Sequence, residues 1–237
     1  MLYRSMLMCA LAFSCIYAEP LSVRAQLIPL YSTVLASEVA GKISQFPLRE
    51  GVSFKKGDML VVLDCALHQA RLNRAHAQIQ ETQKTYEAHQ KLDQLGSISG
   101  LEKDVSHARL LMAKADASLA QAMVERCVIK APFSGRVVER KVNRYEYVAE
   151  GTPLIEIIDD KNLEVEMILP SSSLVWLKIG HPFSLHVEEL GKIFQGKIER
   201  IVSKVDPVSQ SLKLYGSIDV NVEHLYPGMS GTIKIQP

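Results

Sequence analysis

The chain has 237 residues, a formal net charge of +1 at pH 7, and hydrophobic residues at 47% of its positions. This composition is typical of a folded protein, and the length suits one large domain or a few small ones. Because the charge is near neutral and no basic run with interleaved aromatic residues occurs, the sequence argues against a nucleic-acid-binding protein.

The first 18 residues have the pattern of a secretory signal peptide. Arg4 precedes an apolar stretch from Met6 to Tyr17, and Ala18 is a small residue suited to cleavage. A core of about a dozen apolar residues is too short to cross a bilayer as a helix. We therefore expect cleavage after Ala18. Lipidation at Cys15 is the alternative, which the bulky Phe13 disfavours.

The mature chain begins with residues 19–35, which are extended in pattern and are expected to add a strand to one of the two β domains that follow. The sequence does not say which domain. No later run approaches the roughly twenty apolar residues of a membrane-spanning helix. We therefore expect a mature chain that is soluble or peripheral to a membrane.

Two segments on either side of the middle of the chain repeat one pattern of strands and glycines. When Gly41 of residues 36–64 is aligned with Gly135 of residues 128–160, the second turn glycines of the two segments also coincide. Each copy has a strand, a glycine turn, a second strand, another glycine turn and a short apolar strand. The repeat predicts that the segments are two halves of one small β-sandwich.

Residues 65–127, between these halves, contain no proline and are rich in Ala, Gln, Leu, Lys and Glu. Small or apolar residues recur at alternating spacings of three and four, which predicts an antiparallel coiled coil of two helices, each roughly 40 Å long. The predicted seam residues are Leu72, Ala75, Ile79, Thr82 and Tyr86 in the first helix and Leu101, Val105, Ala108, Met112, Ala115, Leu119 and Ala122 in the second. The polar residues around this narrow seam favour a projecting rod over helices packed on a globular core.

The stretch LGSISGLEKD predicts the reversal of the chain between the two helices. Gly96 is placed to end the first helix, and Ser99 with Glu102 three residues later forms a capping-box pattern at the start of the second. His68 and His89 fall on or near the predicted seam. We expect these two histidines to be packed between the helices rather than functional.

Cys65 and Cys127 lie at the two ends of this helical segment. Antiparallel helices would bring them to the same level, and export would place them in an oxidising compartment. We predict a disulfide, which in the chain-entropy model stabilises the fold by roughly 4 kcal/mol. Two free thiols are the alternative. A metal site is disfavoured because two sulfurs lack a third and a fourth ligand.

Residues 161–237 alternate apolar and polar positions in short runs separated by glycine and proline. This pattern predicts a small antiparallel β-barrel. Ser171 to Ile179 is expected to form one short helix at an end of the barrel, where Trp176 would be a core residue. The predicted fold class is therefore mainly β, with a split sandwich, a helical hairpin and a barrel.

The sequence offers no constellation of side chains that indicates catalysis, a cofactor or a metal. The remaining histidines are scattered, and no phosphate loop, carboxylate pair or Ser-His-Asp arrangement can be argued. A biotin or lipoate carrier would need a lysine on a tight exposed turn between the sandwich halves, and residues 65–127 replace that turn. An enzyme is disfavoured, and a carrier protein remains as the alternative of another class. An added prosthetic group in the intact mass would identify a carrier.

In this order of segments the chain resembles a periplasmic adaptor, also called a membrane fusion protein or HlyD-like protein, of RND-type tripartite efflux systems, in a short form. The most specific pieces are GKISQFPLREGVSFKKGDMLVVLD, CVIKAPFSGRVV and LYPGMSGTIKI. The resemblance implies a split lipoyl-like sandwich, a coiled-coil hairpin and a barrel in the periplasm of a Gram-negative bacterium. It also implies partners: an inner-membrane transporter, an outer-membrane channel and further copies in a ring, commonly of six.

The resemblance assigns channel docking to the hairpin tip, where the candidate docking residues are Leu92, Leu95, Ile98 and Ser99. Of these, Leu92, Ile98 and Ser99 fit the family pattern. Ala88 stands where the family usually has an arginine, so direct docking on the usual channel is in question. The expected function is non-catalytic export of small molecules, without a cofactor. An ABC-type exporter or a type I secretion system is an alternative to the RND transporter, and the exported compound is not specified by the sequence.

Overall fold

The computed structural model describes residues 20–218 and 224–236, and the predicted signal peptide lies outside this range. The chain divides into two compact units, one formed by Pro29–Asn162 and the other by the residues up to Ile28 together with Leu163–Pro237. Among the described residues, no helix has both the length and the apolar character needed to cross a membrane.

The two repeated segments form equivalent strands of one β domain. The first half supplies β3 (Gly41–Gln45), β4 (Ser53–Phe54) and β5 (Met59–Leu63), and the second supplies β7 (Gly135–Arg140), β8 (Tyr147–Val148) and β9 (Pro153–Ile158). Each strand of the second half begins at the same offset from its counterpart in the first. The glycine spacing in the sequence therefore reflects a true structural repeat.

The two halves exchange one strand each. One four-stranded sheet has the order β2–β9–β7–β4, with β2 formed by Ser32–Ala36, and the other has the order β6–β5–β3–β8, with β6 formed by Val128–Lys130. Strand β4 thus pairs with β7, and β8 with β3. A single apolar core fills the space between the sheets. Its fully buried residues include Ile43, Leu60, Leu154, Ile155 and Ile157. Since both halves contribute to this core, neither is expected to fold alone.

The second unit is a closed six-stranded barrel in the order β1–β10–β13–β12–β11–β14. Its strands are β1 (Leu21–Pro29), β10 (Leu163–Pro170), β11 (Pro182–Val187), β12 (Lys192–Asp206), β13 (Ser211–Ile218) and β14 (Ser230–Ile235). The short helix expected after β10 is a 3₁₀ turn, Ser171–Val175, and Trp176 packs partly buried against the barrel core. Strand β1 closes the barrel by pairing with β14.

The N-terminal extended segment serves both β domains. Its first part is β1 of the barrel, and its second part is β2, which pairs with β9 of the sandwich. The sequence could not assign this segment to one of the two β domains, because an extended segment with two short strands has the same residue pattern whichever sheet it joins.

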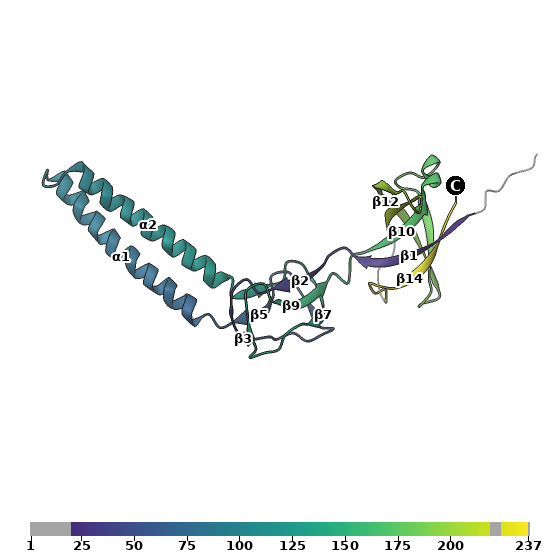
Figure 1. Cartoon of the computed structure of the whole chain (residues 1–237), viewed down its shortest axis with the longest axis horizontal. Helices are drawn as coiled ribbons and strands as arrows, with labels where there is room; N and C mark the ends of the chain where they lie inside the picture. The colour runs from purple at the N-terminus through teal and green to yellow at the C-terminus, as the bar shows by residue number, and fades with distance from the viewer. Residues whose placement is uncertain (1–19, 219–223, 237) are drawn as a thin grey trace, which may run out of the picture. The chain divides into compact units, whose positions relative to one another are not determined.

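Two long helices interrupt the sandwich between β5 and β6 (Figure 1). Helix α1 spans Ala66–Gln94 and α2 spans Gly100–Glu125, and they lie side by side. Strands β5 and β6 pair with each other, so the chain leaves and re-enters the domain at neighbouring strands. The described residues of α1 and α2 are absent from the sandwich core. The helices therefore pack on each other instead of on the sandwich.

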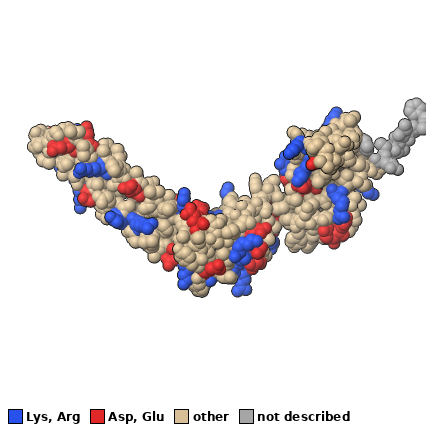
Figure 2. All heavy atoms as spheres, viewed as in Figure 1, with Lys and Arg blue, Asp and Glu red and all other residues tan. Residues whose placement is uncertain are grey.

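Charged side chains of both signs are scattered over the face shown in Figure 2, with no extended region of one sign. This distribution agrees with the near-zero net charge of the chain. A phosphate backbone would need a continuous basic surface, which this face does not present.

Candidate functional site

The tip of the helical hairpin is a compact turn with satisfied backbone groups. Gly96 has a φ of 66°, which glycine adopts without the steric penalty of a side chain. The backbone N–H of Gly96 donates to the carbonyl of Asp93, at 2.9 Å, and that of Ser97 donates to the carbonyl of Leu92, at 2.8 Å. This is the Schellman motif that commonly ends helices. The predicted end of α1 near Gly96 is confirmed.

Apolar side chains are exposed at this tip. Leu95, the C-cap residue of α1, has 76% of its surface exposed, Leu92 is also exposed, and Ile98 is half-buried. Exposed leucines at the end of a rigid turn are costly in water and are suited to burial in the groove of a partner. Ala88, at the position of the usual arginine, is exposed on α1.

Ser99 begins α2 with the predicted capping box. Its hydroxyl accepts a hydrogen bond from the backbone N–H of Glu102, at 3.3 Å, and the Glu102 carboxylate accepts one from the backbone N–H of Ser99, at 3.0 Å. Both bonds satisfy donors that an uncapped helix would leave free. Ser99 therefore has a structural role at the tip, whatever it contacts on a partner.

We expect Ser99→Ala to destabilise the hairpin by about 1 kcal/mol, because alanine cannot accept the N-cap hydrogen bond. Ser99→Asp should retain the stability, since aspartate caps as well as serine. Thermal unfolding followed by the helical circular dichroism signal measures both. Equal losses in the two variants would contradict the capping role.

An ion pair just below the turn sets which residues of the two helices lie opposite each other. Lys103 of α2 donates a hydrogen bond to Asp93 of α1, with Nζ and Oδ2 2.8 Å apart. This bond raises the pKa of Lys103 above its ordinary value, because the Asp93 carboxylate accepts a hydrogen bond from the protonated amine. Asp93 and Lys103 therefore lie opposite each other across the hairpin.

The seam predicted on α1 is confirmed. Leu72 is buried, and Ala75, Ile79, Thr82 and Tyr86 are half-buried. The row continues at both ends with His68 and His89, which are also half-buried. The Nδ1 atoms of these two histidines are buried and have no hydrogen-bond partner among the described residues. They are packed in the seam, as the sequence predicts.

The seam predicted on α2 is wrong. The buried residues of this helix are Ser106, Leu110, Ala113 and Ala117, whereas Leu101, Met112 and Leu119 of the predicted row are more than 60% exposed. The two rows have the same alternating spacing and are shifted by two residues. Such a shift corresponds to roughly 200° around a helix. The prediction therefore selected the opposite face of α2.

The missed row has a pattern of its own in the sequence. Its apolar members, Leu110, Ala113 and Ala117, repeat at spacings of three and four just as the members of the predicted row do. The signal that favours the missed row is charge pairing, because Lys103, which continues the buried row toward the tip, can face Asp93. If the seam is chosen only by the size of its apolar side chains, the row with the larger side chains is selected, and in this helix that row is exposed.

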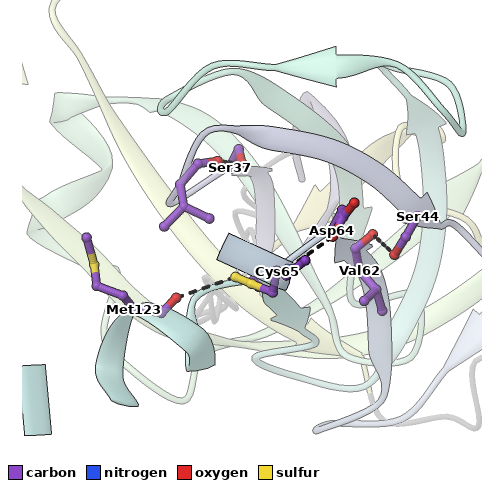
Figure 3. The surroundings of a disulfide bond; sticks show 9 residues. Ser37, Ser44, Val62, Asp64, Cys65 and Met123 are labelled. Carbon is purple, nitrogen blue, oxygen red and sulfur yellow. Dashed lines mark hydrogen bonds between the residues drawn. A yellow bond between two sulfur atoms is a disulfide. The ribbon is translucent and has the colours of Figure 1, made fainter. Parts of the chain in front are cut away.

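A disulfide joins the two helices at their root (Figure 3). The Cα atoms of Cys65 and Cys127 are 6.1 Å apart, within the range that disulfides span. Cys127 is 2% exposed and belongs to the sandwich core, with Cys65 packed against it. Beside the bond, the Asp64 carboxylate accepts the backbone N–H of Ala66, at 3.1 Å, at the start of α1. The predicted clasp at the hairpin root is confirmed.

The described residues contain no group of three or more His, Cys, Asp and Glu side chains placed to hold a metal ion. His107 stacks on Tyr86, with ring centroids 4.8 Å apart. In the barrel, the ring centroid of His181 lies 5.4 Å from that of Trp176, and its Nε2 is 2.7 Å from the carbonyl oxygen of Gln236. Packing and backbone contacts account for these two histidines.

Family models match nearly all of the described chain. Residues 32–159 match the CzcB-like barrel-sandwich hybrid domain, and residues 164–237 match the CusB-like β-barrel domain. The first match alone covers more than half of the chain. The boundary between the matches coincides with the boundary between the two compact units, near Asn162.

One relative and two solved structures illustrate the likeness. An uncharacterized protein of Haemophilus influenzae is 28% identical over 209 residues, which cover 87% of this chain and 55% of the relative. The chain thus spans about half the length of that relative. A crystallised MacA–MexA chimera with the α-hairpin domain of Pseudomonas aeruginosa MexA is 20% identical, with a TM-score of 0.82 over 92% of this chain and 82% of the chimera.

The membrane fusion protein Spr0693 from Streptococcus pneumoniae R6 is 16% identical, with a TM-score of 0.78 over 91% of this chain and 98% of that protein. At these identities the two structures show a shared fold. The family models, the strand exchange in the sandwich and the inserted pair of helices agree with one another. The chain belongs to the family of the CzcB-like barrel-sandwich hybrid domain, carries a CusB-like β-barrel domain, and shares its fold with the membrane fusion protein Spr0693.

Proposed function

We propose that this protein is a non-catalytic periplasmic adaptor that links an inner-membrane efflux transporter of the RND type to an outer-membrane channel. The observation that carries the proposal is the helical hairpin, which interrupts the sandwich between paired strands and ends in exposed leucines. The turn on which a biotin or lipoate carrier would need its lysine is occupied by α1 and α2. Small molecules would be exported through the assembled conduit.

The tip would couple to the channel by shape and apolar burial. Leu92, Leu95 and Ile98 offer apolar surface, and the Schellman motif and capping box hold the turn that presents them. An α-helical end of this kind suits a groove between two helices of a partner. The two helices would wind as a coiled coil, whose seam of small residues keeps the rod slender. Because Ala88 stands in place of the usual arginine, the recognition pattern lacks one positive charge. Apolar contact would therefore contribute most to binding of the channel.

The disulfide supports a periplasmic location. Disulfides persist in oxidising compartments and are rare in the cytosol. Cys65 and Cys127 connect the hairpin root to the sandwich core, so a force or displacement at the tip would be transmitted to a domain that is rigidly packed. An exported adaptor needs such a joint because its two ends contact different partners.

Several copies would form a ring around the export path, and such rings are commonly of six in the family that the chain resembles. A closed ring requires two different complementary surfaces on each copy, repeated by rotation. The sandwich, barrel and hairpin would all contribute to such a ring. An ABC-type exporter or a type I secretion system could use an adaptor ring of the same geometry. Identifying the transporter that is isolated with the chain distinguishes these alternatives from an RND-type system.

The docking role of the tip is tested by a photoreactive phenylalanine derivative placed at Leu95 in cells. We expect it to crosslink to an outer-membrane channel protein. The matched control is the same substitution at Leu67, which is 63% exposed at the root end of α1. Equal crosslinking from both positions, or crosslinks from position 95 only to inner-membrane proteins, would contradict tip docking.

A further inference from the structure

Two turns of the barrel expose aliphatic side chains almost completely. Val175, in the 3₁₀ turn after β10, is 90% exposed, and Val208, in the turn between β12 and β13, is 93% exposed. These are the two highest values for large hydrophobic residues in the described part of the chain. Ile179, in the loop that follows the 3₁₀ turn, is 70% exposed. Protruding aliphatic side chains in such a group mark an interaction surface.

The two turns lie at the same end of the barrel. The end of β10 pairs with the start of β13, so the chain leaves β10 where the other turn finishes. Just beyond this pairing, the backbone N–H of Ser171 donates to the carbonyl of Gln210, at 2.8 Å. We call the surface formed by residues 171–181 and 207–210 the valine end of the barrel.

The backbone at both tips is hydrogen-bonded within the protein. The N–H groups of Val208 and Ser209 donate to Oδ1 of Asp206, at 2.9 and 2.8 Å. In the other turn, the N–H of Trp176 donates to the carbonyl of Ser173, at 3.2 Å. Backbone groups that are already paired lose little when water is removed from them. The tips are therefore suited to contact with an apolar medium.

Lysines accompany the exposed valines. Lys178 lies three residues after Val175, and Lys204 lies four residues before Val208. Both lysines are exposed, and neither forms an ion pair with another residue that the structure describes. The partner of the valine end should therefore combine apolar material with negative charge.

Asp206 is the one acidic residue in residues 171–181 and 204–210. Hydrogen bonds from the backbone N–H and the hydroxyl of Ser209 lower the pKa of Asp206, so its side chain stays a carboxylate at neutral pH. A charged group so close to the tip opposes deep burial in hydrocarbon. Contact of the valine end with an apolar medium is thereby limited to a shallow layer.

The character of these side chains favours a lipid bilayer over a folded protein as the partner. A side chain that is 90% exposed has few neighbours in its own chain, so a protein would need a separate pocket for each valine, whereas a fluid bilayer needs none. Trp176 follows Val175 directly and is half-buried against the barrel core. Aliphatic residues beside tryptophan and lysine are typical of segments that lie in a membrane interface.

The chain also begins at this end of the barrel. Leu21 starts β1, which pairs there with the end of β14. The carbonyl oxygen of Gln236, just after β14, is 2.7 Å from Nε2 of His181 in the valine end. With the expected cleavage after Ala18, Leu21 is the third residue of the mature chain, and signal peptides are cleaved at the membrane. The alternative, lipidation at Cys15, would also hold this end at the bilayer.

We propose that the valine end inserts its aliphatic side chains into the surface of an anionic phospholipid bilayer. Val175, Val208 and Ile179 would lie at the boundary between headgroups and acyl chains, about 5–10 Å deep. Lys178 and Lys204 would contact the lipid phosphates. This contact goes beyond the proposed function, because it needs neither a transporter nor a channel, and it selects a peripheral over a soluble mature chain.

Trp176 is the only tryptophan of the chain, so intrinsic tryptophan fluorescence reports on the valine end alone. The purified mature chain is mixed with vesicles of phosphatidylethanolamine and phosphatidylglycerol, with or without bromine on the acyl chains. We expect brominated vesicles to quench the emission of Trp176 and unbrominated vesicles to leave it unquenched. Equal emission in the two kinds of vesicle would overturn the proposal.

Substitution of the valines tests the apolar part of the contact. Val175→Ser with Val208→Ser should lower the partition coefficient onto these vesicles, measured by cosedimentation, on the order of tenfold. Thermal unfolding should be unchanged, because both side chains are exposed. The matched control is Ile193→Ser with Tyr226→Ser, which changes residues that are 65% and 55% exposed at the opposite end of the barrel. The control should bind as the native chain does.

Substitution of the lysines tests the charged part. Lys178→Glu with Lys204→Glu should weaken binding to the anionic vesicles and leave the weaker binding to phosphatidylcholine vesicles unchanged, because only the former present net negative charge. Failure of the native chain to bind anionic vesicles, or equal losses in the valine and control variants, would overturn the proposal. So would a photoreactive group at position 175 that crosslinks in cells to a protein and not to lipid.

The outcomes separate this inference from the proposed function, since the vesicles contain no other protein. If the chain binds vesicles through the valine end but no transporter or channel accompanies it from cells, the bilayer contact stands and the adaptor role fails. If both proteins accompany the chain but the vesicles do not bind it, the bilayer contact is wrong and the adaptor role stands.

Discussion

Replacing Cys65 and Cys127 together by alanine should lower the free energy of unfolding of the unit Pro29–Asn162 by about 4 kcal/mol. The disulfide closes a long loop, with a sequence separation of 62 between the two cysteines, and the open chain regains that conformational freedom when unfolded. Alanine is the better replacement because serine would bury a hydroxyl at position 127, which is 2% exposed. Denaturant unfolding of the mature chain without reductant measures the change.

Reductant provides the matched control for this prediction. It should lower the stability of the native chain to that of the double alanine variant and should leave the variant unchanged. The helices should persist in the variant, because their seam and caps do not involve the sulfur atoms. Two titratable thiols in the unfolded, unreduced protein would show that the bond is not formed and would contradict the prediction.

Gly135→Ala should destabilise the sandwich by about 3 kcal/mol, while Gly41→Ala should change its stability by less than about 1 kcal/mol. A Cβ at position 135 would collide with the carbonyl oxygen of Ile158 and lie 2.9 Å from its carbonyl carbon. Both atoms are backbone, so no side chain can turn aside. A Cβ at position 41 would be 3.5 Å from its nearest neighbour, an ordinary contact.

The two glycines occupy equivalent places in the repeat, which makes Gly41→Ala the matched control for Gly135→Ala. Chemical unfolding of the two variants under one set of conditions gives the comparison. Equal losses would mean that the repeat position itself requires glycine in both halves. A loss confined to Gly135 would identify the close approach of β7 to the end of β9 as the cause.

Local patterns in the sequence were sufficient to predict most elements of the fold. The repeated glycines and apolar strands predict one sandwich in two halves because both signals depend on residues close in the chain. The end of α1 at Gly96 and the capping box at Ser99 also depend on a few neighbouring residues. The disulfide could be predicted from topology, because two antiparallel helices bring the start of the first and the end of the second close together.

Features that depend on a partner element could not be predicted in the same way. Helix α2 has two rows of equal spacing, and the choice of Leu110, Ala113 and Ala117 for the seam depends on contacts with α1, such as the pairing of Lys103 with Asp93. Gly41 and Gly135 look alike in sequence, yet only the second meets the backbone at Ile158. At the hairpin tip the sequence predicted the turn geometry, while the docking role of the exposed leucines comes from the resemblance and stays a prediction.

Isolation of the tagged protein from crosslinked cells, with identification of the proteins that accompany it, tests most directly whether the chain bridges the two membranes of the envelope. We predict that one preparation contains both an inner-membrane transporter and an outer-membrane channel. We also predict that Leu95→Asp reduces the recovery of the channel about tenfold and leaves that of the transporter unchanged. Recovery of the chain with neither protein, or loss of both in that variant, would contradict the bridging role.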